Sequence, residues 1–394
     1  MSRSLVIVQV PPYPPTGGVA LRNWQTLNLL KRRGDVAIFS LYKGEGNEGS
    51  DFLAHQGFTH VHYDIGSPNR PWLEKVKNRL GWLRPDGYYY SDWLYTAEAA
   101  QLLRQLVTRF QPTLVVFEEL WLYPYFKPVK QALNNRPCTL VLDNHNIEGN
   151  KEDYRLQPRT LRQIRHIEKE FAQQVDQTWV CSTVDAQQLQ QLYGVGNARV
   201  IPNGVQADFY RLSKQSTAAR TNHQLLFLGK FSYQPNEAAA LILINEIYPV
   251  LKQRCPDAQL WLVGRDPTAA MTTAAKTDSD IHITGIVPDV RPYLETASLM
   301  IVPLQQGGGT RLKILEAFAS HCPVVSTTKG AEGLEAEDNV HLCLGETSAQ
   351  LIEKVEYLWQ NPLFAQRVAE TAHALFLQKY SWAAVEKLVS VAVE

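Results

Sequence analysis

Short, continuously apolar segments alternate with longer amphipathic segments along most of this 394-residue chain. Such segments, when rich in β-branched residues, are typical of parallel strands buried on both faces. The helical patterns between them indicate β-α-β units, so the chain is predicted to be an α/β protein. The expected strands are residues 4–10, 35–41, 113–119, 139–145 and 177–183 in a first set, and 225–230, 259–264, 281–286, 299–304 and 323–328 in a second.

A polar, weakly periodic stretch, residues 202–221, separates the two sets of expected strands. We therefore expect two Rossmann-like lobes with a cleft between them, a first domain over residues 1–205 and a second over 206–378. In open parallel sheets, ligands bind beyond the carboxyl ends of the strands. The loops that follow the expected strands are thus the places where a site is expected.

Charge and cysteine content narrow the class of protein. Lys plus Arg and Asp plus Glu both number 39, and this lack of basic excess argues against a nucleic-acid-binding protein. The five cysteines are far apart and show no CxxC spacing, which favours free thiols in a reducing compartment over a disulfide framework or a zinc site. The N-terminal apolar run breaks at Pro11, and no stretch reaches the ~20 apolar residues of a membrane span. We expect a cytoplasmic protein.

Two glycines, Gly17 and Gly18, follow the first expected strand and precede a helical segment for which Gly34 is a natural C-cap. Glycine lets the backbone approach a ligand, and a helix N-terminus offers N–H groups to an anion. A proline-rich turn with structural glycines is the alternative. The pattern is not GxGxxG, and no acidic residue ends the second strand, which argues against an NAD-dependent enzyme.

The segment LDNHNIE, residues 142–148, closes another expected strand. His145 there can donate a hydrogen bond to a sugar hydroxyl or a carbonyl, although a structural histidine in an Asn/Asp-rich turn is equally compatible. Asp143 is a conceivable base, but we expect it to cap the turn.

A lysine follows the first expected strand of the second set, in LFLGKFSYQPNEAA. Lys230 can face a diphosphate as a point charge, or simply lie in solvent. Asn236 precedes a helical segment and is expected to be its N-cap.

The segment GGGTRLKILEA, residues 307–317, carries the strongest signal. Three glycines precede a helix expected to begin near Thr310, whose N–H groups, with Arg311 and Lys313, can hold a diphosphate. Glu316 lies further along the same helix and can accept two hydrogen bonds from ribose hydroxyls. The alternative is a solvated helix with an ordinary glutamate.

Taken in order, these motifs resemble those of the GT-B fold glycosyltransferases of the retaining family 4. The likeness is strongest to the branch with a G-x-x-x-R-x-K-x-x-E-A pattern, which residues 307–317 match. The other motifs that carry the resemblance are GGV, DNHNIE, IPNGV, LFLGKFSYQPN, LVG, ITGIVPDV and IVPL.

The resemblance implies a role for each motif. His145 would contact the transferred sugar, Lys230 would stabilise the leaving diphosphate, and Glu316 would hold the ribose. The implied reaction is transfer of a sugar from a UDP- or GDP-sugar, with retention, to a sugar, lipid-linked or other small acceptor. No metal or other cofactor is expected, because positive side chains and helix dipoles balance the developing charge. Donor contacts are implied for Gly17, Gly18, Gly308, Gly309, Thr310, Arg311 and Lys313.

The sequence departs from the family pattern at two places. Many members have a glutamate eight positions before Glu316, where this chain has Gly308, and a second basic residue soon after Lys230, where this chain has residues 233–236, YQPN. These departures leave two alternatives open. One is a nucleotide-sugar-binding protein without transfer activity, and the other is a different GT-B activity, such as a sugar-phosphate synthase or an epimerase.

The first expected domain contains an aromatic and basic segment, residues 71–95. Such mixtures suit a glycan surface or a membrane interface, although aromatic side chains packed on the domain are the alternative. The resemblance places the acceptor on this domain, with Trp82, Tyr89 and Trp93 as candidates. The aromatic and basic composition also leaves peripheral contact with the inner face of the membrane as an option. It also implies that residues 379–394 form a helix that crosses back to the first domain.

Overall fold

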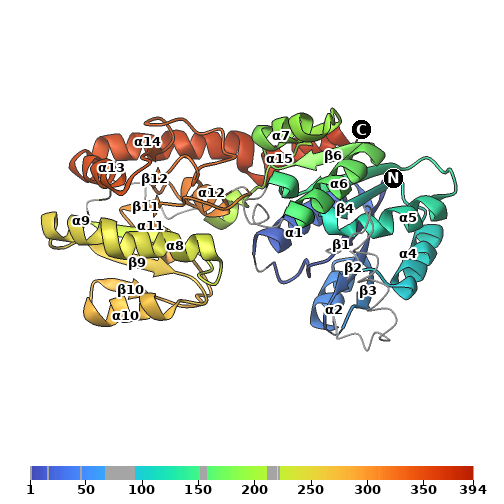
Figure 1. The fold of residues 1–394 in the computed structure, drawn as a ribbon, viewed down its shortest axis with the longest axis horizontal. Helices are drawn as coiled ribbons and strands as arrows, with labels where there is room; N and C mark the ends of the chain where they lie inside the picture. Colours follow the sequence, from blue (N-terminus) through green and yellow to red (C-terminus); the bar gives the residue numbers. More distant parts are fainter. Residues whose placement is uncertain are drawn as a thin grey trace. The chain divides into compact units, whose positions relative to one another are not determined.

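The computed structural model of the chain describes residues 2–15, 17–44, 47–66, 94–150, 158–210, 220, 222–309 and 311–393. They form two compact units, one of residues 1–201 with 386–394 and one of residues 202–385. Each unit has its own buried apolar core. Figure 1 colours the first unit mainly blue to green and the second mainly yellow to red.

The first unit is built on a parallel sheet in the order β3-β2-β1-β4-β5-β6-β7. The chain moves outward from β1 through β2 to β3 and then returns to the other side of β1 as β4. This reversal is the topological switch point of a Rossmann-like sheet, where ligands bind. The strands are β1 (Ser2–Val8), β2 (Gly34–Tyr42), β3 (Thr59–Asp64), β4 (Leu114–Glu118), β5 (Thr139–Asn144), β6 (Gln177–Val180) and β7 (Ala198–Val200).

Helices connect these strands, as parallel pairing requires. Thr96 caps α4 and Ser182 caps α7, each by accepting a hydrogen bond from a backbone N–H of the first turn. The helices are α1 (Gly18–Lys31), α2 (Asn47–His55), α4 (Ala97–Phe110), α5 (Phe126–Leu133), α6 (Pro158–Gln174) and α7 (Thr183–Tyr193), with short helices η1 (Leu120–Tyr125) and η2 (Glu148–Asn150).

The second unit repeats the arrangement, with a parallel sheet in the order β10-β9-β8-β11-β12-β13. Here the switch point lies between β8 and β11, so the loops after these two strands meet at one edge of the sheet. The strands are β8 (Gln224–Leu228), β9 (Gln259–Val263), β10 (Ile281–Ile283), β11 (Leu299–Val302), β12 (Val324–Ser326) and β13 (Cys343–Leu344).

The last helix, α15 (Trp382–Ala392), begins in the second unit, and its residues from Glu386 onward belong to the first. In Figure 1 its red ribbon runs beside β6, where the Gln177 amide donates to the Ala392 carbonyl over 2.7 Å. The other helices of the second unit are η4 (Ala207–Tyr210), α8 (Gln234–Ile242), η6 (Leu243–Ile247), α9 (Tyr248–Arg254), α10 (Ala269–Thr277), α11 (Arg291–Thr296), α12 (Leu312–Ala319), α13 (Ser348–Gln360), α14 (Pro362–Leu375) and η7 (Phe376–Tyr380).

The fold confirms the predicted α/β class with two Rossmann-like sheets, and each expected segment overlaps a strand. The expected C-cap of the first helix was wrong. Arg32 caps α1, and Gly34 instead begins β2 so close to β1 that an added Cβ would meet the Ser2 carbonyl at 2.1 Å. Among the described residues, no helix is both long and apolar enough to cross a membrane.

Candidate functional site

A buried ion pair links the first helix to the sheet of the first unit. Arg22, in the first turns of α1, donates from Nε to both carboxylate oxygens of Asp143, at 3.0 and 2.9 Å, and from Nη1 to the Ile201 carbonyl at 2.8 Å. Both side chains are almost wholly buried. The expectation that Asp143 caps a turn was wrong, because it lies within β5 and pairs with an arginine that sequence reasoning had not singled out.

A buried carboxylate orients His145. Glu118, the last residue of β4, accepts from His145 Nε2 over 2.8 Å, while Glu119 lies 3.9 Å from Nδ1. Burial raises the pKa of Glu118 to about 7 and that of Asp143 to about 6. Sequence reasoning found His145 and missed Glu118. The signal for it was a glutamate closing an otherwise apolar strand, in TLVVFEE.

The two N-terminal glycines lie between β1 and the first turn of α1, and β1 is one of the two strands at the switch point of the first sheet. Gly17 precedes α1 with φ of 123°, a conformation that L side chains rarely adopt. Both glycines are exposed. The backbone of this turn is thus open to a ligand, as expected of a helix N-terminus that approaches an anion.

In the second unit, a chain of polar contacts joins the loops after β8 and β11. Lys313 of α12 donates from Nζ to Asn236 Oδ1 over 2.8 Å, and Asn236 Nδ2 donates to the Lys230 carbonyl over 3.0 Å. Lys313 Nζ also lies 4.1 Å from the centre of the Phe227 ring. Burial lowers the pKa of Lys313 to about 7. Asn236 is therefore not the expected N-cap, a position that Tyr233 holds, but the link between Lys313 and the Lys230 loop.

Glu316 lies one turn further along α12 and accepts a hydrogen bond from the Tyr210 hydroxyl over 2.8 Å. Burial raises the pKa of this carboxyl, against the hydrogen bond from Tyr210 and the charge of Lys313. Tyr210 belongs to the stretch that the sequence marked only as a polar connection. Its contact with Glu316 makes that stretch part of the second unit's site.

Arg311 holds the glycine loop rather than reaching into solvent. Its Nη1 donates to the Gly308 carbonyl over 3.0 Å, and its Nη2 donates to the Gly307 carbonyl over 2.8 Å. Gly307 has φ of 99°, and an added Cβ would meet Tyr233 Oη at 3.0 Å. The side chain of Arg311 thus fixes the loop backbone, and a direct phosphate contact from it stays a prediction.

The remaining predicted residues divide into exposed ones and ones outside the described residues. Lys230 is exposed, with Nζ 4.0 Å from Asp266 Oδ2, and Gly308 is exposed on the loop. Gly309 has φ of 81°, so it too requires glycine. Helix α12 begins at Leu312, slightly later than expected. Thr310 and the acceptor candidates Trp82, Tyr89 and Trp93 lie outside the described residues.

Two family models match the chain. Residues 16–209 match the model described as Glycosyltransferase Family 4, and residues 222–361 match the model described as Glycosyl transferases group 1. A curated relative, an uncharacterized 44.6 kDa protein in the cps region of Klebsiella pneumoniae, is 22% identical over 167 residues. That match covers 40% of this chain and 43% of the relative, so the chain spans less than half of its length.

Solved structures are similar to the chain over its whole length. Anabaena HepE, in complex with UDP and glucose, superposes with a TM-score of 0.72 at 14% identity, covering 100% of this chain and 99% of that one. Sucrose-phosphate synthase from Thermosynechococcus elongatus superposes with a TM-score of 0.73 at 14% identity, covering 99% of this chain and 98% of that one.

Two Rossmann-like units, with this likeness over the full length, define the class as the GT-B fold. The two family models together cover most of the chain, and the chain is a family 4-like glycosyltransferase.

Proposed function

We propose that the chain transfers a sugar from a nucleotide-diphosphate sugar to an acceptor. The observation that carries the proposal is the cluster of Lys313, Asn236, Glu316 and Tyr210 at the switch point of the second sheet. It combines a cation suited to a diphosphate with a carboxylate suited to ribose hydroxyls, on one helix.

In this proposal the second unit holds the donor. Glu316 accepts hydrogen bonds from the ribose hydroxyls, and Tyr210 fixes the carboxylate for that purpose. Lys313 and the exposed Lys230 neutralise the diphosphate, and the backbone of Gly308 and Gly309 approaches it closely. HepE has been solved with UDP and with UDP-glucose, which supports a uridine nucleotide as the first donor to test. A guanosine nucleotide is the next choice.

The first unit contributes His145. Because its Nε2–H is donated to Glu118, a hydrogen bond from Nδ1 to the transferred sugar requires the imidazolium form of the side chain. The hydrogen bond to Glu118 holds the imidazole in one orientation. We propose that transfer proceeds with retention, and that Gly17 and Gly18 lie against donor phosphates or the acceptor. The acceptor is a sugar or a lipid-linked glycan, with the segment 71–95 as its contact region and as the point of any membrane contact.

We propose that transfer needs no metal. Glu118, Asp143 and His145 place ligand atoms within 4.8 Å of one another, a spacing that suits a cation. However, the guanidinium of Arg22 already engages both oxygens of Asp143, and His145 engages Glu118. These buried carboxylates are thus already balanced, and Lys313 and Lys230 are the cations proposed for the diphosphate, so transfer is expected to persist in excess chelator.

Glu316→Gln is expected to weaken binding of a nucleotide sugar by ~10- to 150-fold, because hydrogen bonds to a charged acceptor contribute about 1.5–3 kcal/mol. The nucleoside diphosphate alone should lose the same factor, since the ribose is common to both ligands. Calorimetric titration of wild type and variant checks this. Tyr210→Phe keeps the Glu316 carboxylate and should weaken binding of the nucleotide sugar much less. If Glu316→Gln lost as much affinity for a ribose-free diphosphate as for the donor, the assignment of Glu316 to the ribose would be contradicted.

Binding of the donor is expected to weaken as pH rises above 7. The pKa of Lys313 in the free protein is lowered to about 7, so its ammonium is present below that pH and lost above it. A bound diphosphate favours the ammonium, so binding at higher pH must take up a proton. The limiting slope is ~10-fold in Kd per pH unit. Titrations between pH 7 and 8.5 check this, and Lys313→Met should bind weakly with no such slope. A donor affinity of the wild type that does not change with pH would contradict this role of Lys313.

Two other functions are separated by one assay. The likeness to a sucrose-phosphate synthase favours a sugar phosphate as an alternative acceptor, and Gly308 favours a binding protein without transfer. Release of nucleoside diphosphate is measured with donor alone, with neutral glycans and with sugar phosphates. Release stimulated by a glycan supports the proposal, release stimulated only by a sugar phosphate supports the synthase, and tight binding without release supports the binding protein.

A further inference from the structure

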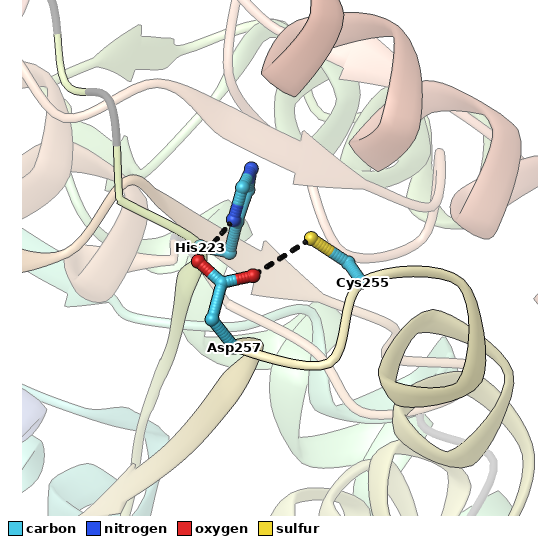
Figure 2. Close-up of side chains that lie close together, drawn as sticks. All are labelled: His223, Cys255 and Asp257. Atoms are coloured by element: carbon cyan, nitrogen blue, oxygen red, sulfur yellow. Dashed lines mark hydrogen bonds and ion pairs between the residues drawn. The ribbon is translucent and has the colours of Figure 1, made fainter.

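A second cluster of side chains with metal-ligating atoms lies in the second unit, away from the residues discussed above. Figure 2 shows His223, Cys255 and Asp257 pointing toward one another from two segments. Asp257 accepts from His223 Nδ1 over 2.8 Å through one carboxylate oxygen and from Cys255 Sγ over 3.2 Å through the other. The three ligand atoms all lie within 4.8 Å of one another. A nitrogen, a sulfur and an oxygen ligand therefore converge on one small volume.

The backbone that carries these side chains is fixed by hydrogen bonds. His223 directly precedes β8, and its carbonyl accepts from the Gln259 N–H over 3.0 Å, the first contact of the β8–β9 pairing. Cys255 caps the end of α9, and its backbone carbonyl accepts from the Ala258 N–H over 2.9 Å. Lys252 ties the same turn together by donating to the Pro256 carbonyl over 2.6 Å. The ligands are thus arranged before any ion arrives.

The surroundings of the cluster suit a cation that is reached from solvent. The Trp359 ring meets the His223 imidazole edge-on, with centroids 4.7 Å apart, and its indole N–H donates to Ser298 Oγ. Asp257 has 69% of its side chain exposed, so the volume between the ligands is open on one side. This differs from the buried cluster of the first unit, where the guanidinium of Arg22 already bonds to both oxygens of Asp143 and so occupies the place of a metal ion.

We propose that His223, Cys255 and Asp257 bind a divalent cation of the zinc type, with water as the fourth ligand. Mixed nitrogen, thiolate and carboxylate ligands suit zinc and cobalt better than magnesium or calcium, which prefer oxygen alone. On binding, the thiol releases its proton to solvent, and the imidazole binds as the neutral ring through Nδ1 with its proton on Nε2. The hydrogen bonds that now hold the cluster are replaced by bonds to the ion.

The site lies at the amino ends of β8 and β9, whereas Lys230 and the glycine loop follow the carboxyl ends of β8 and β11. The ion would therefore take no part in sugar transfer. It would join the start of β8 to the α9–β9 turn and stabilise the second unit. The cysteine spacing had favoured free thiols over a zinc site, because Cys255 lies in no CxxC motif and is far from His223 along the chain.

Cobalt titration of untagged, chelator-treated full-length protein tests the proposal. Wild type should bind one Co²⁺ with a thiolate-to-cobalt charge-transfer band, and Zn²⁺ should abolish the band by displacement. Cys255→Ser should lose the band, and Asp257→Asn and His223→Gln should weaken binding at least ~10-fold, a loss that even less direct changes at metal sites produce. Thermal unfolding of each variant confirms that it is folded, and the metal should raise the unfolding temperature of wild type much more than that of these three variants.

Two control variants sharpen the result. Cys138→Ser removes another half-buried thiol and should keep the band. His145→Ala removes a ligand of the first unit's cluster and should also leave cobalt binding unchanged. Absence of a thiolate band in wild type, or a band that survives in Cys255→Ser, would overturn the proposal. So would a band that is lost in His145→Ala but kept in His223→Gln and Asp257→Asn.

Discussion

Replacement of Arg22 by methionine is expected to lower the free energy of unfolding by about 3–5 kcal/mol, the usual cost of removing one partner from a buried ion pair. The Asp143 carboxylate would be left in the core without the guanidinium that now bonds to both its oxygens. The Ile201 carbonyl would lose the same partner. Chemical denaturation of the full chain, followed by near-ultraviolet circular dichroism, measures the change.

A matched control lies at the other end of the same helix. Arg32 forms an exposed ion pair with Glu386, and such pairs contribute only about 0–1 kcal/mol. Arg32→Met should therefore be almost neutral. The double variant Arg22→Met with Asp143→Leu removes both buried charges and should regain much of the stability that the single variant loses. Equal costs for Arg22→Met and Arg32→Met would contradict this description of the first unit's core.

The second large effect is expected at His145. If this side chain donates a hydrogen bond that strengthens as the glycosidic bond breaks, His145→Ala should reduce the rate of transfer by ~10²- to 10³-fold, as the loss of such a donor does in other enzymes. Affinity for the nucleoside diphosphate should be nearly unchanged, because Lys313 and Glu316, the side chains proposed to hold it, are not altered. Steady-state transfer and calorimetric titration of the same variant measure the two quantities.

Glu118→Gln separates positioning of the imidazole from its chemistry. The amide still accepts a hydrogen bond from His145 Nε2, so the rate should fall much less than in His145→Ala. The dependence of the transfer rate on pH should change. Burial raises the pKa of Glu118 to about 7, and the glutamine that replaces it does not ionise. His55→Ala, at the exposed end of α2, is the histidine control. A His145→Ala variant with an unchanged rate would remove this residue from the site.

The central strands that the sequence predicted and the strands that it missed differ in burial. Central strands such as β4 are covered on both faces, so they carry continuous apolar runs that stand out along the chain. The missed strands, β3, β7 and β13, all lie at the edges of the two sheets. Their residues are largely half-buried or exposed, and they are shorter or more polar. Edge strands carry weaker patterns because only part of each is covered.

The site shows a similar division. Lys313 and Glu316 were predicted because they belong to one helix that follows a glycine run, a purely local pattern. Arg22, Glu118 and Tyr210 were missed because each reaches its partner only through the order of strands and helices in three dimensions. Asn236 was assigned the wrong role for the same reason, since its partner Lys313 lies 77 residues away.

The central claim, that the second unit binds a nucleotide-diphosphate sugar, is tested most directly by thermal unfolding of the full chain with UDP-, GDP- and ADP-sugars. At about 100 times its dissociation constant, a bound donor should add ~2.7 kcal/mol to the stability of the form that binds it. We predict that one base family, with UDP-glucose tested first, raises the unfolding temperature, while inorganic diphosphate raises it far less and the free sugar does not raise it. A chain that no nucleotide sugar stabilises, even at millimolar concentration, would contradict the account.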